Sequence, residues 1–165
     1  MFFIRTAMER DLPAVSQLLR KTWHATYDAI YGEARVSQIS DAWHSVSALR
    51  PRIGRPSSEF IVGDNGEFLG GVGYAASSDV DRALVVLHQL YVLPDEQRAG
   101  LGSEMLLELM NAFPDGRRMR CEVEPANVGA VAFYKKHGFE PTGTAMARDS
   151  STDGVEVTVF ERLLG

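Results

Sequence analysis

The chain has 165 residues, of which 45% are hydrophobic and 24% are charged, as in an ordinary globular domain. Its net charge of −5 argues against nucleic-acid binding through bulk positive charge, so an anionic ligand needs a local set of donors. The single cysteine, Cys121, excludes an internal disulfide and fits a reducing cytoplasm, and no apolar run reaches membrane-spanning length. We therefore expect one cytoplasmic domain over residues 1–165, a monomer or homodimer without membrane or nucleic-acid partners.

The N-terminal third predicts a strand and two helices. Residues 2–5 form a short apolar strand, and Asp11 is expected to cap the first helix. The second helix is predicted over residues 36–49, and the Arg- and Pro-rich residues 50–56 end it as a loop. The apolar positions at helical spacing are Leu12, Val15, Leu19 and Trp23 in the first helix, and Val36, Ile39, Trp43 and Val46 in the second.

The middle of the chain predicts three strands. Residues 60–62 and 68–74 are apolar runs joined by Asp64-Asn65-Gly66, and Asn-Gly between two such runs is a strong hairpin signal. Residues 75–81 have the composition of a polar turn. Residues 84–93 then form a long strand that ends before a proline.

The last third predicts a helix over residues 101–113, a strand over 119–124 and a second helix over 127–137. In the final strand Val155, Val157 and Val159 alternate with polar residues, and we expect this strand to pair with the segment after Phe139. The whole order predicts an α/β fold, with a mixed central sheet of about six to seven strands and about four helices on its faces.

The run Gln97-Arg98-Ala99-Gly100-Leu101-Gly102-Ser103 lies between the long strand and the helix that follows it. Its two glycines leave backbone N–H groups uncovered, and the helix behind them adds the positive end of its dipole. Together these features predict a phosphate site made of main chain. The alternative is a plain strand-to-helix turn without a ligand.

Three stretches carry a resemblance to a known family. They are Leu90-Tyr91-Val92-Leu93-Pro94, Gln97-Arg98-Ala99-Gly100-Leu101-Gly102, and Asn127-x-x-Ala130-x-x-Phe133-Tyr134-x-x-x-Gly138-Phe139. In this order and context the chain resembles the GCN5-related N-acetyltransferase (GNAT) superfamily, whose members use acetyl-CoA. The resemblance implies the GNAT fold and acetyl-CoA as acyl donor, with no metal.

The resemblance also implies how acetyl-CoA binds. The pyrophosphate would lie on residues 97–103, and a splayed strand would offer the N–H groups near Leu90 and Val92 to the pantetheine arm. One of these N–H groups would polarise the thioester carbonyl. The alternative is a fully paired central strand. The residues implied in binding are Leu90, Tyr91, Val92, Gln97, Arg98, Ala99, Gly100, Leu101, Gly102, Ser103, Asn127, Phe133 and Tyr134.

Tyr134 and Glu122 are the residues to which the resemblance gives catalytic roles. Tyr134 would protonate the departing thiolate, because a phenol with an ordinary pKa of about 10 still carries its proton at neutral pH. Glu122 would act as base, as in the branch that acetylates the N-terminus of a ribosomal protein. His88 on the preceding strand is the rival base, because its ordinary pKa of about 6.5 suits that role, and water is a third possibility. Tyr134 could instead be a packing residue.

In this superfamily the N-terminal helices line the acceptor pocket, so His24, Tyr27 and Tyr31 are candidates to face the substrate. The arginines of the loop 50–56 either stay solvated or meet an acidic acceptor. We expect acetyl transfer to a primary amine of a small molecule or a protein, through a ternary complex. The alternatives are an acyl-CoA sensor without catalysis and an acyltransferase with a longer acyl donor.

Overall fold

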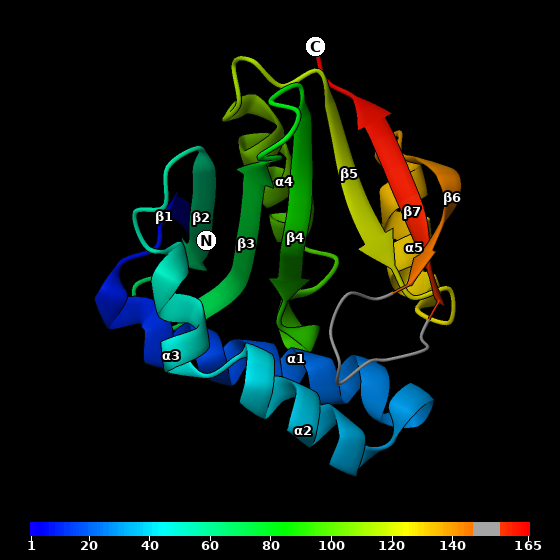
Figure 1. The fold of residues 1–165 in the computed structure, drawn as a ribbon. Helices are drawn as coiled ribbons and strands as arrows, with labels where there is room; N and C mark the ends of the chain where they lie inside the picture. Colours follow the sequence, from blue (N-terminus) through cyan, green and yellow to red (C-terminus); the bar gives the residue numbers. More distant parts are fainter. Residues whose placement is uncertain (147–155) are drawn as a thin grey trace.

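One mixed sheet organises the part of the chain that the computed structural model describes, residues 1–146 and 156–165 (Figure 1). Its strand order is β1-β2-β3-β4-β5-β7-β6, and all neighbours are antiparallel except the parallel pair β4 and β5. The strands are β1 (Phe3–Thr6), β2 (Ser58–Asp64), β3 (Leu69–Ser77), β4 (Leu84–Val92), β5 (Arg118–Val123), β6 (Glu140–Met146) and β7 (Glu156–Leu163).

Helices cover both faces of the sheet. The helix α1 packs its buried leucines against Phe60 and Val72 on one face, while α4 packs against Ile61 and Val85 on the other, where α5 also lies (Figure 1). Successive side chains of β2 point to opposite faces of the sheet, so Phe60 and Ile61 belong to two separate cores. The predicted α/β class and mixed sheet are thus confirmed. The helices are α1 (Leu12–Tyr31), α2 (Glu33–Trp43), α3 (Val46–Leu49), α4 (Leu101–Asn111) and α5 (Val128–Lys136).

The single helix predicted over residues 36–49 is wrong, because the segment forms α2 and α3. Ser45 is extended between them, and its hydroxyl accepts the N–H of Ala48 at 3.2 Å, which begins a new helix. The apolar periodicity continues across the break, since Val36, Ile39 and Leu49 are all buried. Periodicity alone therefore could not reveal the break.

The polar turn predicted over residues 75–81 is also partly wrong. The strand β3 continues to Ser77, and Ala75 and Ala76 are buried between β2 and β4. At the C-terminus the predicted hairpin is confirmed for the described residues, because β6 pairs antiparallel with β7. Val155, placed in this strand by its alternation, lies outside the described residues. Among the described helices, none is long and apolar enough to cross a membrane.

Asp11 precedes α1, but it is not the side-chain cap that the sequence predicts. Its carboxylate accepts two hydrogen bonds from the guanidinium of Arg5, both at 2.8 Å, and one from the N–H of Met8 at 2.7 Å. The hydrogen bonds from Arg5 are the largest cause that lowers the pKa of Asp11. The side chain is thus used to hold β1 against the turn before α1.

This contact predicts a stability that depends on pH. Because the pKa of Asp11 is lower in the folded state, its stabilisation is complete above the unfolded pKa of about 3.9 and is lost as the pH falls through the folded pKa. Asp11→Asn should lower the free energy of unfolding by about 1–3 kcal/mol at neutral pH. Urea unfolding at about pH 7 and about pH 3 would test this. An equal stability difference between wild type and variant at both pH values would contradict it.

Candidate active site

The strands β4 and β5 separate along their length. Their parallel pairing joins only Leu84–Val86 with Arg118–Arg120, although β4 runs on to Val92 and β5 to Val123. Figure 1 shows the gap between the two arrows widening toward α1. The splay that the family resemblance implies is therefore confirmed, and among the described residues it leaves one edge of β4 free of a neighbouring strand.

Backbone groups of β4 face into this opening. The N–H of Leu93 donates to the carbonyl of Gly70 on the β3 side at 2.9 Å. Because N–H groups alternate between the two edges of a strand, those of Val92 and Leu90 face the opening. The side chain of Gln97 donates to the carbonyl of Val92 at 3.0 Å, which agrees with this orientation. The free edge thus presents two donors to any extended ligand in the gap.

A β-bulge alters the direction of β4 side chains next to the opening. The register with β3 shifts from Tyr74↔Gln89 to Ala75↔Leu87, so His88 is the extra residue. The His88 ring lies 5.5 Å from the ring of Tyr74. Bulges commonly re-aim side chains next to active sites. Here both His88 and Gln89 line the same cleft.

The predicted phosphate site lies at the start of α4. Gly100 has a φ of +90° at the N-cap, and Arg98 has a φ of +72°, which is costly for a residue with a side chain. In the described part of the chain no side chain caps this helix, and the N–H of Glu104 donates to the carbonyl of Gly100 at 3.0 Å. The N–H groups of residues 101–103 therefore remain available. Gln97, Arg98, Ala99 and Gly100 are exposed, whereas the Leu101 side chain is buried in the core.

Gly102 connects the start of α4 with the opening. A Cβ atom here would lie in ordinary van der Waals contact, 3.5 Å from the ring of Phe133 and 3.6 Å from Val92, so a longer side chain would fill the space beside them. The hydroxyl of Ser103 lies 2.9 Å from Nε2 of His137. The pKa of His137 is lowered chiefly by burial, which favours the neutral ring. The uncapped helix start and the absence of a side chain at Gly102 fit a phosphate group followed by a slender extended arm.

Tyr134 lies on α5 and is buried, with its ring 5.3 Å from that of Phe139. Its pKa is raised well above the usual value, first by burial and then by the neighbouring Cys121 and Tyr27. The pKa of Tyr91 is raised by burial, and Tyr27 and Tyr134 raise it further. Phenols from α5, α1 and β4 thus lie within electrostatic range of one another, and each stays protonated at neutral pH.

Two hydrogen bonds link the end of α1 to the loop between β5 and α5. Asn127 caps α5, as predicted, by accepting the N–H of Ala130 at 3.2 Å, and its Nδ2 also donates to the hydroxyl of Tyr27 at 3.3 Å. The hydroxyl of Tyr31 donates to Glu124 at 2.6 Å. These contacts fix α1 next to the widened end of the gap.

The side chains of β5 divide between its two faces as the sequence predicts. Met119, Cys121 and Val123 are buried, while Glu122 on the opposite face is exposed. Burial is also the main cause that raises the pKa of the Cys121 thiol to about 12. Because a thiol needs to ionise to act as a nucleophile, Cys121 is unreactive at neutral pH.

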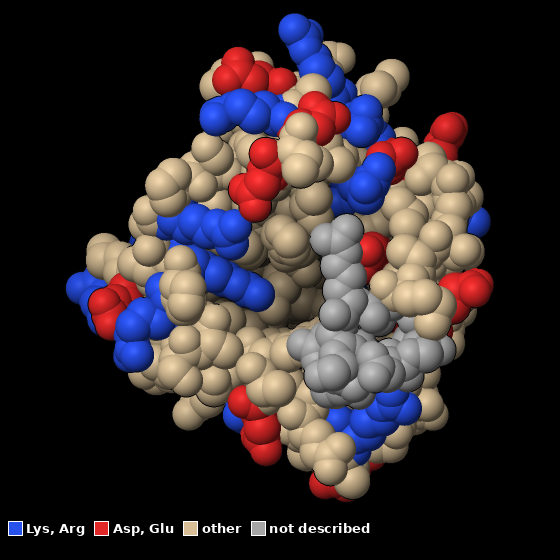
Figure 2. Space-filling view, in the orientation of Figure 1, with Lys and Arg blue, Asp and Glu red and all other residues tan. Residues whose placement is uncertain are grey.

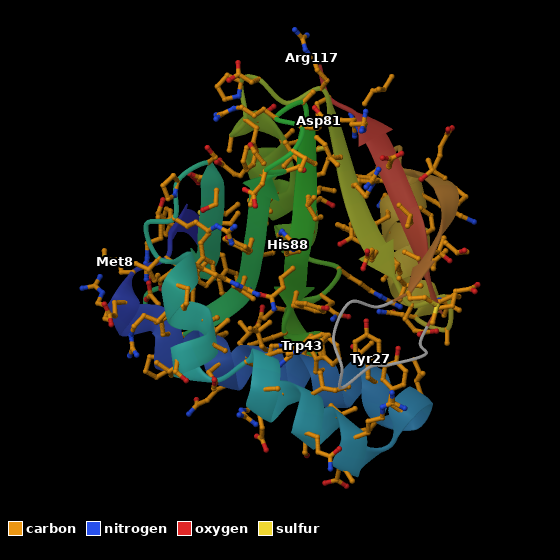
Figure 3. All side chains as sticks on the ribbon, viewed as in Figure 1. Met8, Tyr27, Trp43, Asp81, His88 and Arg117 are labelled. Carbon is orange, nitrogen blue, oxygen red and sulfur yellow. The ribbon has the colours of Figure 1, made fainter. Side chains whose placement is uncertain are left out.

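A cleft of about 560 Å³ lies where α1 and α2 meet the splayed strands. Both candidate bases, Glu122 and His88, line it. Figure 2 shows this hollow from outside, and Figure 3 shows His88 on β4, Trp43 on α2 and Tyr27 on α1 around it. The structure therefore brings the two rival bases to one cavity.

The N-terminal candidates divide between cleft and surface. Tyr27 and Tyr31 line the cleft. His24 does not line it, because its Nδ1 lies 2.7 Å from a carboxylate oxygen of Asp28, one turn further along α1. Arg52 lines the cleft as well, although the sequence offered no way to separate it from the other loop arginines.

Comparison with known proteins gives a family and a fold. Residues 13–139 match the sequence profile of the Acetyltransferase (GNAT) family. Curated protein sequences gave no significant match.

Solved structures resemble this chain over nearly its full length. The PaiA N-acetyltransferase of Thermoplasma acidophilum, in complex with coenzyme A, is 22% identical, with 99% of both chains covered and a TM-score of 0.86. The yncA protein of Salmonella typhimurium, solved with acetyl-CoA, is 18% identical, with 100% of this chain and 95% of that one covered and a TM-score of 0.69. The ribosomal-protein-S18-alanine N-acetyltransferase of Escherichia coli is 15% identical, with the same coverage and a TM-score of 0.72.

Proposed function

Because the chain belongs to the acetyltransferase (GNAT) family, we propose that it transfers an acetyl group from acetyl-CoA to a primary amine while both substrates are bound. The observation that carries the proposal is the splay of β4 and β5. The uncapped start of α4 lies near this opening, and a cleft that contains Glu122 adjoins it. The opening therefore joins a site for phosphate to a site for an amine.

The chain's own residues supply the binding groups for acetyl-CoA. Residues 97–103 hold the pyrophosphate through backbone N–H groups, and Gly102 leaves room for the pantetheine arm beside Phe133. The N–H groups of Leu90 and Val92 pair with that arm as a neighbouring strand would. Two of the similar structures were solved with coenzyme A or acetyl-CoA, which supports this choice of ligand.

Catalysis then requires three contributions from the chain. Acetyl-CoA supplies an acyl group activated as a thioester. Glu122 removes a proton from the ammonium of the acceptor, directly or through water, and the freed amine is the nucleophile. A backbone N–H of the 90–92 segment donates to the carbonyl oxygen as negative charge develops there. Tyr134 gives its phenolic proton to the sulfur of the departing thiolate.

Direct transfer between the two substrates is favoured over a covalent enzyme intermediate. Cys121 is the one cysteine of the chain, and the raised pKa of its thiol keeps that thiol protonated, so it is not available as a nucleophile. A free buried thiol also suits a reducing cytoplasm, which is where we propose that the enzyme works.

The test is the appearance of free CoA thiol when the protein is mixed with acetyl-CoA and a broad panel of amines. We expect thiol release that depends on one or more of the amines. Binding of acetyl-CoA without thiol release from any amine would instead indicate a sensor. Faster release from longer acyl-CoA donors would indicate a different acyl preference.

Gly102→Val tests the proposed position of the arm and the pyrophosphate. Acetyl-CoA should raise the melting temperature of the wild type because it binds the folded state, and the variant should lose that rise. Gly143→Val is the matched control, because Gly143 lies on the exposed strand β6, where a Cβ atom would meet no heavy atom within 4 Å. An unchanged rise in a folded Gly102→Val protein would contradict this placement.

A further inference from the structure

Arg52 differs from the other arginines of its loop in where its side chain lies. Its guanidinium lies over the ring of Tyr74, 4.7 Å from the centroid, and donates a hydrogen bond to Oε1 of Gln89. By contrast, Arg50 pairs with Glu9 at 2.8 Å, and Arg55 is exposed. In Figure 2 basic side chains border the hollow on the side of α3. One of the three loop arginines therefore lines the cleft.

The charge of Arg52 has no acidic partner in the described part of the chain. No carboxylate of residues 1–146 or 156–165 lies within ion-pair distance of it, and Gln89 is the acceptor found for its five N–H groups. Burial is the largest cause that lowers the pKa of Arg52, and Arg55 lowers it further. A half-buried cation without a counter-ion is stabilised further by a ligand that supplies negative charge.

The polar groups around Arg52 are mainly donors. The amide oxygen of Gln89 is occupied by Arg52, which leaves its NH₂ group as donor. The hydroxyl of Tyr74, on which Arg52 stacks, is buried without a hydrogen-bond partner among the described residues. Arg120 also lines the cleft, but it is already bound to Glu161 at 3.0 Å. This side of the cleft is thus complementary to an anion that Arg52 would bind.

The β5 side of the same cleft carries the opposite charge. Glu122 is exposed there, and Glu124 accepts a hydrogen bond from Tyr31. A carboxylate that faces the cleft favours an ammonium group. The cleft therefore presents a cation from the loop after α3, and carboxylates from β5 and from the residue just after it, which together match a ligand with both charges.

We propose that the amine acceptor carries a carboxylate, which Arg52 binds while the amine faces Glu122. The proposal rests on the function proposed above and narrows its substrate class. A carboxylate is favoured over a phosphate because one arginine balances its single negative charge, whereas a phosphate dianion carries a second charge that Arg52 alone does not balance. Tyr74 and Gln89 position the guanidinium.

The experiment compares acceptors that differ in the carboxylate alone. The panel contains α- and ω-amino acids of increasing length, each with its carboxamide, and aminoalkyl phosphonates of the same lengths. For the wild type we expect kcat/KM to favour the best acid over its amide by about 10²-fold or more, mainly through KM. Arg52→Gln should remove this preference, and Arg55→Gln is the matched control that should keep it.

The possible results separate the two proposals. If the wild type has equal kcat/KM for acids and their amides, and Arg52→Gln does not change these values, Arg52 is a packing residue. That result would overturn this proposal alone. A preference for phosphonates over carboxylates would overturn the assignment of a carboxylate. If acetyl-CoA still raises the melting temperature but no amine, in this panel or any other, causes thiol release, both the proposed function and this proposal are overturned.

Discussion

Tyr134→Phe is expected to lower kcat by about 10²-fold or more while the affinity for acetyl-CoA stays nearly unchanged, because general acid assistance contributes about 10²–10⁴-fold. The phenol is buried and its pKa is raised, so it still carries its proton at neutral pH. Phenylalanine fills the same space beside Phe139 and removes the hydroxyl alone. Steady-state and single-turnover kinetics with acetyl-CoA would measure the loss.

Tyr91→Phe is the matched control, because Tyr91 is a neighbouring phenol whose pKa is also raised by burial. Its removal should cost much less turnover than the removal of the Tyr134 hydroxyl. Near-normal turnover of Tyr134→Phe, with chemistry shown to be rate-limiting, would assign Tyr134 to packing. A larger loss in Tyr91→Phe would move the role of acid to Tyr91.

Glu122→Gln is expected to lose most turnover, together with the acidic limb of the kcat/KM profile. A base acts only when deprotonated, so activity that depends on it falls as the pH drops below its pKa. His88→Gln should keep both the turnover and the acidic limb of the kcat/KM profile. Each variant is expected to fold, since Glu122 and His88 are both exposed, and melting curves would check this. The measurement is kcat/KM against pH for all three proteins.

The acidic limb could also report the amine of the acceptor, so the profile should be repeated with an acceptor of different amine pKa. A limb that moves with the acceptor and survives Glu122→Gln would show that Glu122 is not the base. A limb that disappears in His88→Gln alone would assign the base to His88. The structure places both side chains on the same cleft, so this choice depends on kinetics.

The local features of the candidate site could be predicted from the sequence. Gly100 and Gly102 mark the start of α4, where Gly100 adopts a left-handed conformation and Gly102 lies beside Phe133 and Val92. The alternation on β5 separated the exposed Glu122 from the buried Cys121 by period two alone. Asn127 indicated the start of α5 through its capping chemistry.

Features set by tertiary contacts could not be predicted from the sequence. The bulge at His88 depends on how β4 pairs with β3, and no local pattern encodes it. Asp11 has the residue type of a helix cap, yet its carboxylate is taken by Arg5. Arg52 lies in a loop without periodicity, and its position in the cleft follows from stacking on Tyr74, a residue 22 positions further along the chain.

The most direct test of the account is the product formed by the wild-type protein from acetyl-CoA labelled in its acetyl group. An amine accepted in the thiol screen would be added, and labelled N-acetyl product would be quantified by mass spectrometry beside the free CoA. We predict labelled N-acetylamine in an amount equal to the CoA released, and little of either from Tyr134→Phe. Labelled acetate in place of the N-acetylamine would show hydrolysis, and it would contradict the claim that the opening between β4 and β5 delivers an acetyl group to an amine in the cleft.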